Sequence, residues 1–141
     1  MRDGIELPPI EAIIDLHAEA LKAHGGAPGL RDRGALEAAL ARPHHILAYS
    51  EKSSVTVFDL AAALCVSICR AHAFVDGNKR AALTALGVTL MMNGLMLDVS
   101  EREAAEKITA LAAGTLSEEE FSAWVERNSY EMPQDRSCCD V

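Results

Sequence analysis

The stretch Ala71–Arg80, with the sequence AHAFVDGNKR, gathers histidine, aspartate, asparagine, lysine and arginine side chains around one glycine. It links the two most apolar parts of the chain, VFDLAAALCVSICRAHAF at 57–74 and AALTALGVTLMMNG at 81–94. Segments of that length and apolar character are typical of buried helices. The polar stretch is therefore a joint between two buried helices, which raises the question of a binding or catalytic site.

Four residues of the joint form a candidate anion site. A helix that begins near Gly77 or Asn78 offers free N–H groups and the positive end of its dipole at that point. Gly77 lets the backbone approach a phosphate closely, and Asn78 can turn the chain or donate its amide. Lys79 and Arg80 add positive charge in the first helical turn, where the dipole disfavours cations unless an anion binds there.

Two more side chains add reactive groups to this anion site. Asp76 could hold a magnesium ion that bridges phosphate oxygens. His72 is suited to remove a proton from an incoming hydroxyl near neutral pH. A base, a metal ligand, an anion cradle and two cations together describe phosphoryl or nucleotidyl transfer.

Each of these residues also has an ordinary structural interpretation. His72 could simply end its helix, and Asp76-Gly77-Asn78 could be a plain turn. Lys79 and Arg80 could lie on a solvated helix face. From the residues alone, both the phosphate site and the structural interpretation stay open.

The composition favours a helical protein of one domain. Hydrophobic residues make up 50% of the 141 and aromatic residues only 4%, so the core must be built from Ala, Leu, Val, Ile and Met. A net charge of −8 opposes direct binding to nucleic acid or to an anionic membrane. Since no signal segment and no apolar run of about 18 residues is evident, we expect a soluble cytoplasmic protein without membrane association.

The cysteines predict neither disulfides nor a zinc site. Cys65 and Cys69 lie in an apolar helical run and are expected to be small core residues. Cys138 and Cys139 lie in a polar tail, and zinc-finger spacing is missing.

We expect an all-α bundle of five to six helices around the two buried central ones. The sequence marks where each remaining helix begins or ends: Pro8-Pro9 and Gly25-Gly26 for the first, Asp32 and Pro43 for the second, Gly94 after the second central helix, and Ser100 with Glu103 and Ser117 with Glu120 for the last two. Residues 43–56 are expected to be irregular, with His44 and His45 in a surface loop. Residues 95–99 are expected to be an extended link.

Some residues beside the joint have a structural interpretation only. His17 lies on the apolar side of the first helix and is expected to be a hydrogen-bonded core histidine. Met91, Met92 and Met96 are also expected in the core. One domain over 1–129 and a disordered tail over 130–141 complete the expected organisation.

At the joint, HAFVDGNKR resembles the signature of the Fic/Doc (Fido) superfamily, H-x-F-x-[D/E]-[G/A]-N-x-x-R. It is most similar to the death-on-curing (Doc) toxin branch, whose members carry Asn-Lys-Arg where Fic proteins carry Asn-Gly-Arg. The resemblance continues over residues 24–43, 92–100 and 111–125, and so covers nearly the whole chain except the tail. It implies a Fido-type helical bundle.

The resemblance implies a role for each matching position. His72 matches the catalytic histidine and Asp76 the acidic residue that places magnesium, with ATP as the substrate. Gly77 and Asn78 match the anion-binding turn, and Lys79 and Arg80 match the phosphate-contacting cations. Phe74 matches the structural aromatic residue of the motif. Residues 46–57 correspond to the family's flap, which borders the active site. For the loop at 25–32 the resemblance implies no firm role.

One departure from the Fic pattern bears on the reaction. Fic proteins that transfer AMP usually carry a second arginine, and that position here is Leu83. The Doc branch also lacks it and is similar to a protein kinase that phosphorylates a threonine of elongation factor Tu and arrests protein synthesis. The resemblance thus favours a kinase acting on a Ser/Thr hydroxyl of a translation protein. AMP transfer and a catalytically silent Fido binding module remain the alternatives.

The resemblance also implies control by a partner. Many Fic proteins carry an autoinhibitory helix with the pattern Ser/Thr-x-x-x-Glu-Gly/Asn. Neither Thr115-x-x-x-Glu119 nor Ser122-x-x-x-Glu126 fits it fully, because Glu120 and Arg127 follow. A type II toxin–antitoxin system with a Phd-like antitoxin is therefore implied, with an acidic or amphipathic antitoxin segment in a groove between helices.

Overall fold

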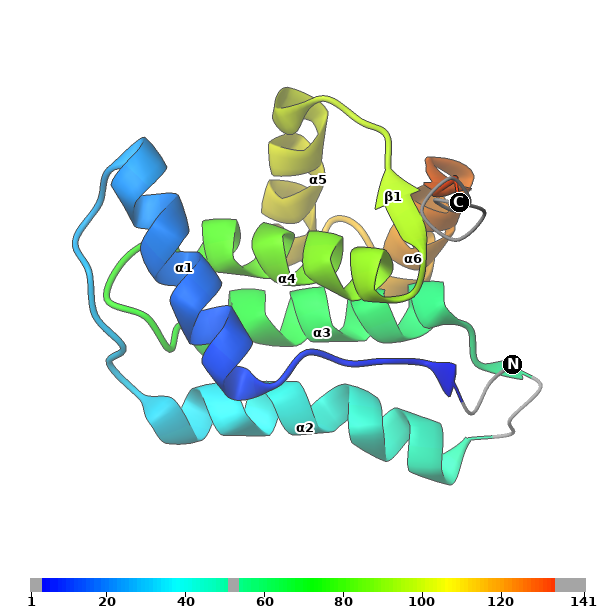
Figure 1. Ribbon diagram of the computed structural model, residues 1–141, viewed down its shortest axis with the longest axis horizontal. Coiled ribbons are helices and arrows are strands. Elements are labelled where there is room, and N and C mark those ends of the chain that lie inside the picture. The colour runs from blue at the N-terminus through cyan, green and yellow to red at the C-terminus, as the bar shows by residue number, and fades with distance from the viewer. Residues whose placement is uncertain (1–3, 51–53, 134–141) are drawn as a thin grey trace, which may run out of the picture.

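The computed structural model describes residues 4–50 and 54–133, and Figure 1 shows that they form a helical bundle. Two antiparallel helices, α3 (Val57–Ala71) and α4 (Asn78–Met92), run through its centre. In this view α2 (Arg33–Tyr49) lies below them, α5 (Glu101–Ala113) above, and α1 (Ile10–His24) across the front. The sixth helix, α6 (Glu118–Arg127), packs against α3. The expected all-α bundle around two central helices is confirmed.

The core is built mainly from small and aliphatic side chains of the two central helices. Both helices bring alanines that are at most 1% exposed to this core: Ala61, Ala62 and Ala63 on α3, and Ala81, Ala82 and Ala85 on α4. Cys65 and Cys69 are buried free thiols, and burial raises the pKa of both. Their interpretation as core residues is therefore confirmed. Among the described residues no helix is long and apolar enough to cross a membrane.

The predicted end of the second helix at Pro43 is wrong. α2 continues to Tyr49, with Pro43 buried inside it. A proline in a helix interior removes one backbone hydrogen bond and crowds the preceding turn, but here its ring packs into the core. His44 and His45 therefore lie exposed on α2 and not in a loop. The flap residues 51–53 lie outside the described part of the chain.

The extended link expected at 95–99 contains a strand of a small sheet. β1 (Leu95–Leu97) pairs antiparallel with β2 (Ser129–Glu131), with Leu95 opposite Glu131. The domain boundary expected at residue 129 thus falls inside a strand, while residues 134–141 of the expected tail lie outside the described residues. Strands of three residues are too short for an alternating pattern to reveal them.

The methionines at the end of α4 are another difference from the prediction. Met91 and Met92 are 50% and 39% exposed, so their expected place in the core is wrong. Met96 on β1 is half-buried. The apolar run of α4 continues past the helices that cover it, which composition alone does not indicate.

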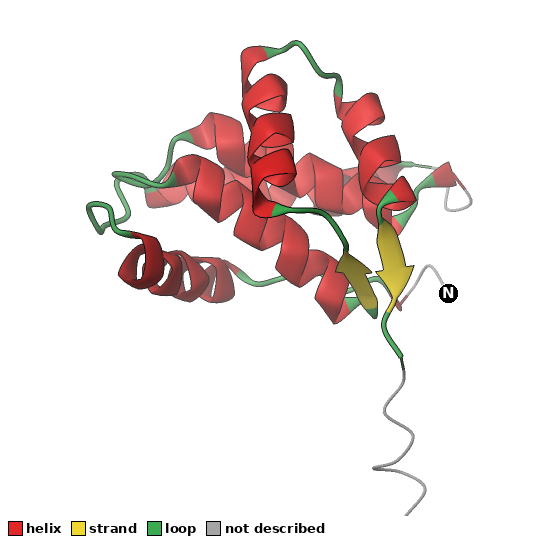
Figure 2. Ribbon diagram, turned by 90° about the horizontal axis from the view of Figure 1, so that it is seen from above, coloured by secondary structure: helices red, strands yellow, loops and turns green. Residues whose placement is uncertain are grey.

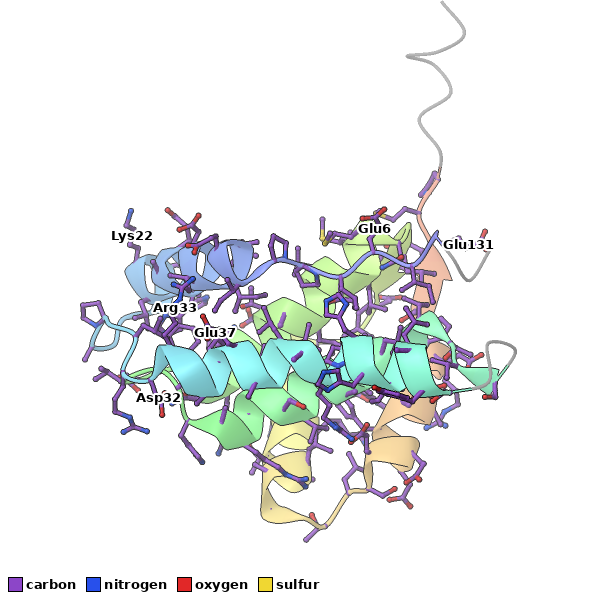
Figure 3. All side chains as sticks on the ribbon, turned by 90° about the horizontal axis from the view of Figure 1, so that it is seen from below. Glu6, Lys22, Asp32, Arg33, Glu37 and Glu131 are labelled. Carbon is purple, nitrogen blue, oxygen red and sulfur yellow. The ribbon has the colours of Figure 1, made fainter. Side chains whose placement is uncertain are left out.

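Side-chain caps begin the helices where the sequence predicts them. Asp32 Oδ1 accepts from the Ala35 N–H (3.0 Å) at the start of α2, which Figure 3 shows beside α1. Ser117 and Glu120 form a reciprocal capping box on α6. Ser100 caps α5, but the Glu103 carboxylate accepts from the indole of Trp124 (3.1 Å) and does not complete a box.

One ion-pair cluster fastens α1 to α2. Arg33 lies at the start of α2 beside Glu37, on the side facing α1 (Figure 3). Its guanidinium contacts Glu37 at 3.2 Å and Glu11 of α1 at 2.9 Å. Because all three side chains are about half exposed or more, the cluster contributes little to the free energy of unfolding. It does help to fix the position of α1.

The capping box of α6 predicts a pH-dependent contribution to stability. Hydrogen bonds from the backbone and side chain of Ser117 lower the pKa of Glu120. A carboxyl with a lowered folded-state pKa stabilises the fold above its unfolded pKa, about 4.3, and loses this contribution as the pH falls through the folded value. Glu120→Gln, which resembles the protonated acid, should therefore lower the free energy of unfolding at neutral pH.

Chemical denaturation at several pH values between 7 and 3 measures this contribution. The difference between wild type and Glu120→Gln should shrink as the pH falls below about 4. Glu119→Gln makes the same charge change in the same turn without touching the capping box, and serves as the control. A difference for Glu120→Gln that stays constant over the whole range would contradict this account.

Candidate active site

The joint between α3 and α4 lies against the loop that follows α1. Figures 1 and 2 show the two loops, 25–32 and 72–77, meeting at one end of the molecule. Leu30 and Phe74 form an antiparallel bridge between them. The other backbone hydrogen bonds of this pairing run from Arg31 and Asp32 to the Ala73 carbonyl (2.7 and 2.9 Å) and from Val75 to the Gly29 carbonyl (3.0 Å). The 25–32 loop therefore supports the joint along its length.

His72 ends α3 in a left-handed backbone conformation. Its φ of 50° is the one positive value outside glycine among the described residues, and such values are uncommon for residues with a side chain. The guanidinium of Arg31 donates a hydrogen bond to the His72 carbonyl oxygen. The His72 side chain itself is exposed at the joint.

One cavity brings all the predicted site residues together. It measures about 370 Å³ and is lined from three elements: Cys69 of α3, the joint and first turn of α4 (His72, Val75, Asp76, Gly77, Asn78, Lys79 and Arg80), and Ala112 of α5. A histidine, a carboxylate and two cations thus face one space.

Two larger cavities, of about 500 and 520 Å³, lie around Asn93. The ionisable lining residue is Glu131 in one and Glu6 in the other, both at the end of the molecule opposite Asp32 (Figure 3). Their negative charge opposes phosphate binding. The smaller cavity at the joint is therefore the better phosphate site.

Gly77 is the N-cap residue of α4, and no side chain caps the first turn of this helix. The first N–H groups of a helix have no partner within it, so those of Asn78, Lys79 and Arg80 are available at the cavity. The Asn78 side chain is engaged with Phe74: its Oδ1 accepts from the Phe74 N–H (2.9 Å) and its Nδ2 donates to the Phe74 carbonyl (3.0 Å). Asn78 therefore shapes the joint, while backbone N–H groups are left for an anion.

The Asp76 carboxylate is held by two backbone N–H groups. Oδ1 accepts from Gly77 (2.8 Å) and Oδ2 from Ala27 of the neighbouring loop (3.2 Å). A carboxylate has about four acceptor sites, so it retains capacity for a metal ion.

Asp76 is compatible with magnesium when phosphate supplies further ligands. Among the described residues no three His, Cys, Asp or Glu side chains gather at a metal site. Magnesium beside nucleotides commonly takes one or two carboxylates, phosphate oxygens and waters. The exposed Asp76 carboxylate at the helix start fits that requirement.

The two cations of the cavity differ in their surroundings. Arg80 lies 3.5 Å from Glu101 of α5, in a pair that is largely exposed on the glutamate side and therefore weak. Lys79 is exposed and has no carboxylate partner within the described part of the chain. Burial raises the pKa of Cys69 in the cavity wall, while the charges of Lys79 and Arg70 oppose that rise. Positive charge therefore reaches the cavity.

His17 is buried, as the sequence predicts, and it contacts the joint. Its ring stacks on Phe74 with centroids 3.8 Å apart. Its Nε2 lies 2.8 Å from the carbonyl oxygen of Asp76. Phe74 is 1% exposed, so the structural role that the resemblance implied for this aromatic agrees with its position in the core.

Sequence reasoning missed the contribution of the 25–32 loop and of His17 to this site. A pairing between residues more than 40 positions apart leaves no local pattern. The signal that could have found it is the glycine content of the loop. Gly26 has φ 123°, and a side chain there would come within 3.1 Å of the Asp76 carboxylate, so glycine is needed where the two loops touch.

Comparison with known proteins identifies the family of the chain. The model of the Fic/DOC family matches residues 7–90, which include both loops. The chain is 35% identical over 107 residues to "Protein kinase doc" of Escherichia phage P1, covering 76% of this chain and 82% of that protein. It is 45% identical over 75 residues to "Toxin Doc" of Mycolicibacterium smegmatis (strain ATCC 700084 / mc(2)155), covering 53% of this chain and 57% of that protein.

Gly77 provides a test of the close packing under the joint. Its φ is 75°, and an added Cβ would lie 3.2 Å from both His17 Nε2 and Leu21 Cδ2. Gly94 has a similar φ of 79° with nothing within 4 Å of an added Cβ. Gly94→Ala should lower the free energy of unfolding by about 1–2 kcal/mol from backbone strain alone. Gly77→Ala should lower it further, because strain and crowding combine.

Denaturant unfolding of the two variants measures that difference. Equal losses in Gly77→Ala and Gly94→Ala would show that α1 does not constrain the joint.

Proposed function

The chain belongs to the Fic/DOC family, and from this premise we propose that it is a Doc-like toxin with kinase activity. It transfers the γ-phosphate of ATP to a serine or threonine hydroxyl of a translation protein such as elongation factor Tu, and so arrests protein synthesis. One observation carries the proposal: His72, Asp76 and the uncapped start of α4 line a single cavity. The names of the two relatives, a protein kinase and a toxin, support the same activity.

Each residue of the cavity has one task in this reaction. The N–H groups at the start of α4, with Lys79 and Arg80, bind the phosphates of ATP. Asp76 would hold magnesium, which supplies charge neutralisation on the phosphate oxygens. His72 accepts the proton of the target hydroxyl, whose oxygen attacks the γ-phosphorus. The bond from that phosphorus to the β–γ bridging oxygen breaks, and ADP leaves.

Leu83 supports phosphoryl transfer over AMP transfer. It is packed against the hydrophobic core one turn after Lys79 and Arg80, so it offers no charge to a phosphate. The cations that line the cavity are the adjacent Lys79 and Arg80, both in the first turn of α4. We propose that this arrangement directs the γ-phosphate to the attacking hydroxyl.

A separate antitoxin is the proposed means of control. The glutamates of the two partial patterns are Glu119, which lines a different cavity beside Arg42, and Glu126, which is exposed on α6 and does not line the cavity at the joint. Neither carboxylate reaches the cations of the proposed active site. We therefore propose that another chain inhibits the protein, a Phd-like antitoxin with an acidic or amphipathic segment. We place both proteins in the cytoplasm with the translation machinery.

Transfer of label from ATP tests the proposed reaction. Elongation factor Tu incubated with the protein should acquire label from the γ-phosphate and none from the α-phosphate. His72→Asn should reduce this transfer by about 10²–10⁴-fold because the proton acceptor is lost. Asparagine also tolerates the left-handed backbone. His45→Asn, an exposed change on α2, is the control.

Other patterns of labelling would contradict the kinase. Label from the α-phosphate would support AMP transfer. Absence of any label would support a catalytically silent binding module. A folded His72→Asn protein with near wild-type transfer would remove His72 from the proposed mechanism.

Magnesium dependence tests the role of Asp76. Asp76→Asn keeps an oxygen for one of the two N–H groups, of Gly77 or of Ala27, and loses the charge that attracts the metal ion. It should raise the magnesium concentration needed for binding of a fluorescent ATP analogue by about tenfold or more. Asp32→Asn makes the same change at a helix cap where asparagine is equally suitable, and should leave binding unchanged. Transfer by the wild type that persists in excess EDTA would contradict this role.

A further inference from the structure

We propose that His17 is a positioning residue of the catalytic cavity. It lies on α1, 3% exposed, and takes no part in the chemistry proposed above. Its Nε2 contacts the carbonyl oxygen of Asp76, which is 59 residues away in the sequence. The inference rests on the proposed function, since it concerns the arrangement of that site.

The partner of His17 determines which ring nitrogen carries hydrogen. A carbonyl oxygen can only accept, so at 2.8 Å the hydrogen lies on Nε2 of His17. Both the neutral Nε2–H tautomer and the imidazolium ion have this hydrogen. His17 is therefore the donor in this contact.

This hydrogen bond orients the peptide group that holds the catalytic carboxylate. No peptide bond among the described residues is cis, so the C=O of Asp76 and the N–H of Gly77 point in opposite directions. With the C=O directed at His17, the N–H of Gly77 is directed away from α1. There it donates to Asp76 Oδ1 at 2.8 Å. His17 thereby fixes the carboxylate through the backbone.

The same peptide group leads directly into α4. The Gly77 carbonyl accepts the first hydrogen bond of that helix, from Ala81 (2.8 Å). A Cβ added to Gly77 would lie only 3.2 Å from His17 Nε2. The imidazole ring therefore fills the space beside the start of the helix. It also stacks on Phe74, whose backbone is bonded to the Asn78 side chain. The ring thus contacts the joint on both sides of Val75.

Two substitutions separate positioning by the N–H group from simple packing. His17→Phe keeps an aromatic ring that can stack on Phe74 but removes the donor. His17→Gln removes the ring but offers an N–H group at similar reach. If His17 only fills space, the phenylalanine variant should behave as wild type and the glutamine variant should be impaired. If it positions Asp76 and Gly77, the order is reversed.

Three measurements on the full chain compare these variants. Amide hydrogen exchange over residues 73–80 should be faster in His17→Phe than in wild type or His17→Gln. The magnesium concentration for half-maximal binding of the fluorescent ATP analogue should rise about 10–100-fold in His17→Phe. In the transfer assay His17→Phe should lower kcat and leave KM for the protein substrate near the wild-type value, because His17 is 3% exposed and does not line the cavity. His17→Gln should restore all three.

The exchange and binding measurements remain informative if the wild type transfers no phosphate, so failure of this inference is distinguishable from failure of the proposed function. The inference would be overturned if His17→Phe had the same amide exchange over residues 73–80 and the same magnesium dependence as the wild type. Equal impairment of His17→Phe and His17→Gln would also overturn it. Nitrogen NMR of the wild-type histidines provides a test without substitution. An Nε2–H resonance of His17 protected from exchange supports the hydrogen bond, and the Nδ1–H tautomer would overturn it.

Discussion

The pairing of the 25–32 loop with the joint at 72–77 is the constraint from which the site follows. Two central helices packed through alanines require only a short connection, and many conformations would close it. The antiparallel bridge between Leu30 and Phe74 selects one of them. That conformation turns His72 into the left-handed region and brings the Asp76 carboxylate to the Ala27 N–H. The position of α1 is part of the same constraint, because its C-terminal end leads directly into the loop.

The charge distribution makes recognition at this cavity a short-range effect. With a net charge of −8 the whole chain repels a nucleotide at a distance. At an ionic strength of 0.1 M, however, interactions beyond about 10 Å are largely screened. Within that range the cavity presents the start of α4, Lys79 and Arg80 together with the Asp76 carboxylate, and Arg80 pairs with Glu101. The proposed phosphate binding would therefore depend on local contacts and not on the field of the whole protein.

The sequence predicted the central helices and the residues of the cavity, because both depend on short-range signals. The apolar runs locate α3 and α4, and the polar stretch between them contains the histidine, the aspartate and the two cations that line the cavity. The end of α2 was wrong because tertiary packing outweighed the tendency of Pro43 to end a helix. The pairing of the two loops and the contact of His17 with Asp76 could not be predicted, since they join residues 41 to 59 positions apart in sequence and their acceptors are backbone oxygens that every residue has.

We propose that the joint is already arranged to bind phosphate before ATP arrives. A crystal structure of the protein with magnesium and a non-hydrolysable ATP analogue tests it most directly. We expect the terminal phosphates to lie against the N–H groups of Asn78, Lys79 and Arg80, with the Leu30–Phe74 bridge and the His17 hydrogen bond unchanged. Phosphates bound in the cavities around Asn93, or a joint that separates from the 25–32 loop to admit the nucleotide, would contradict it.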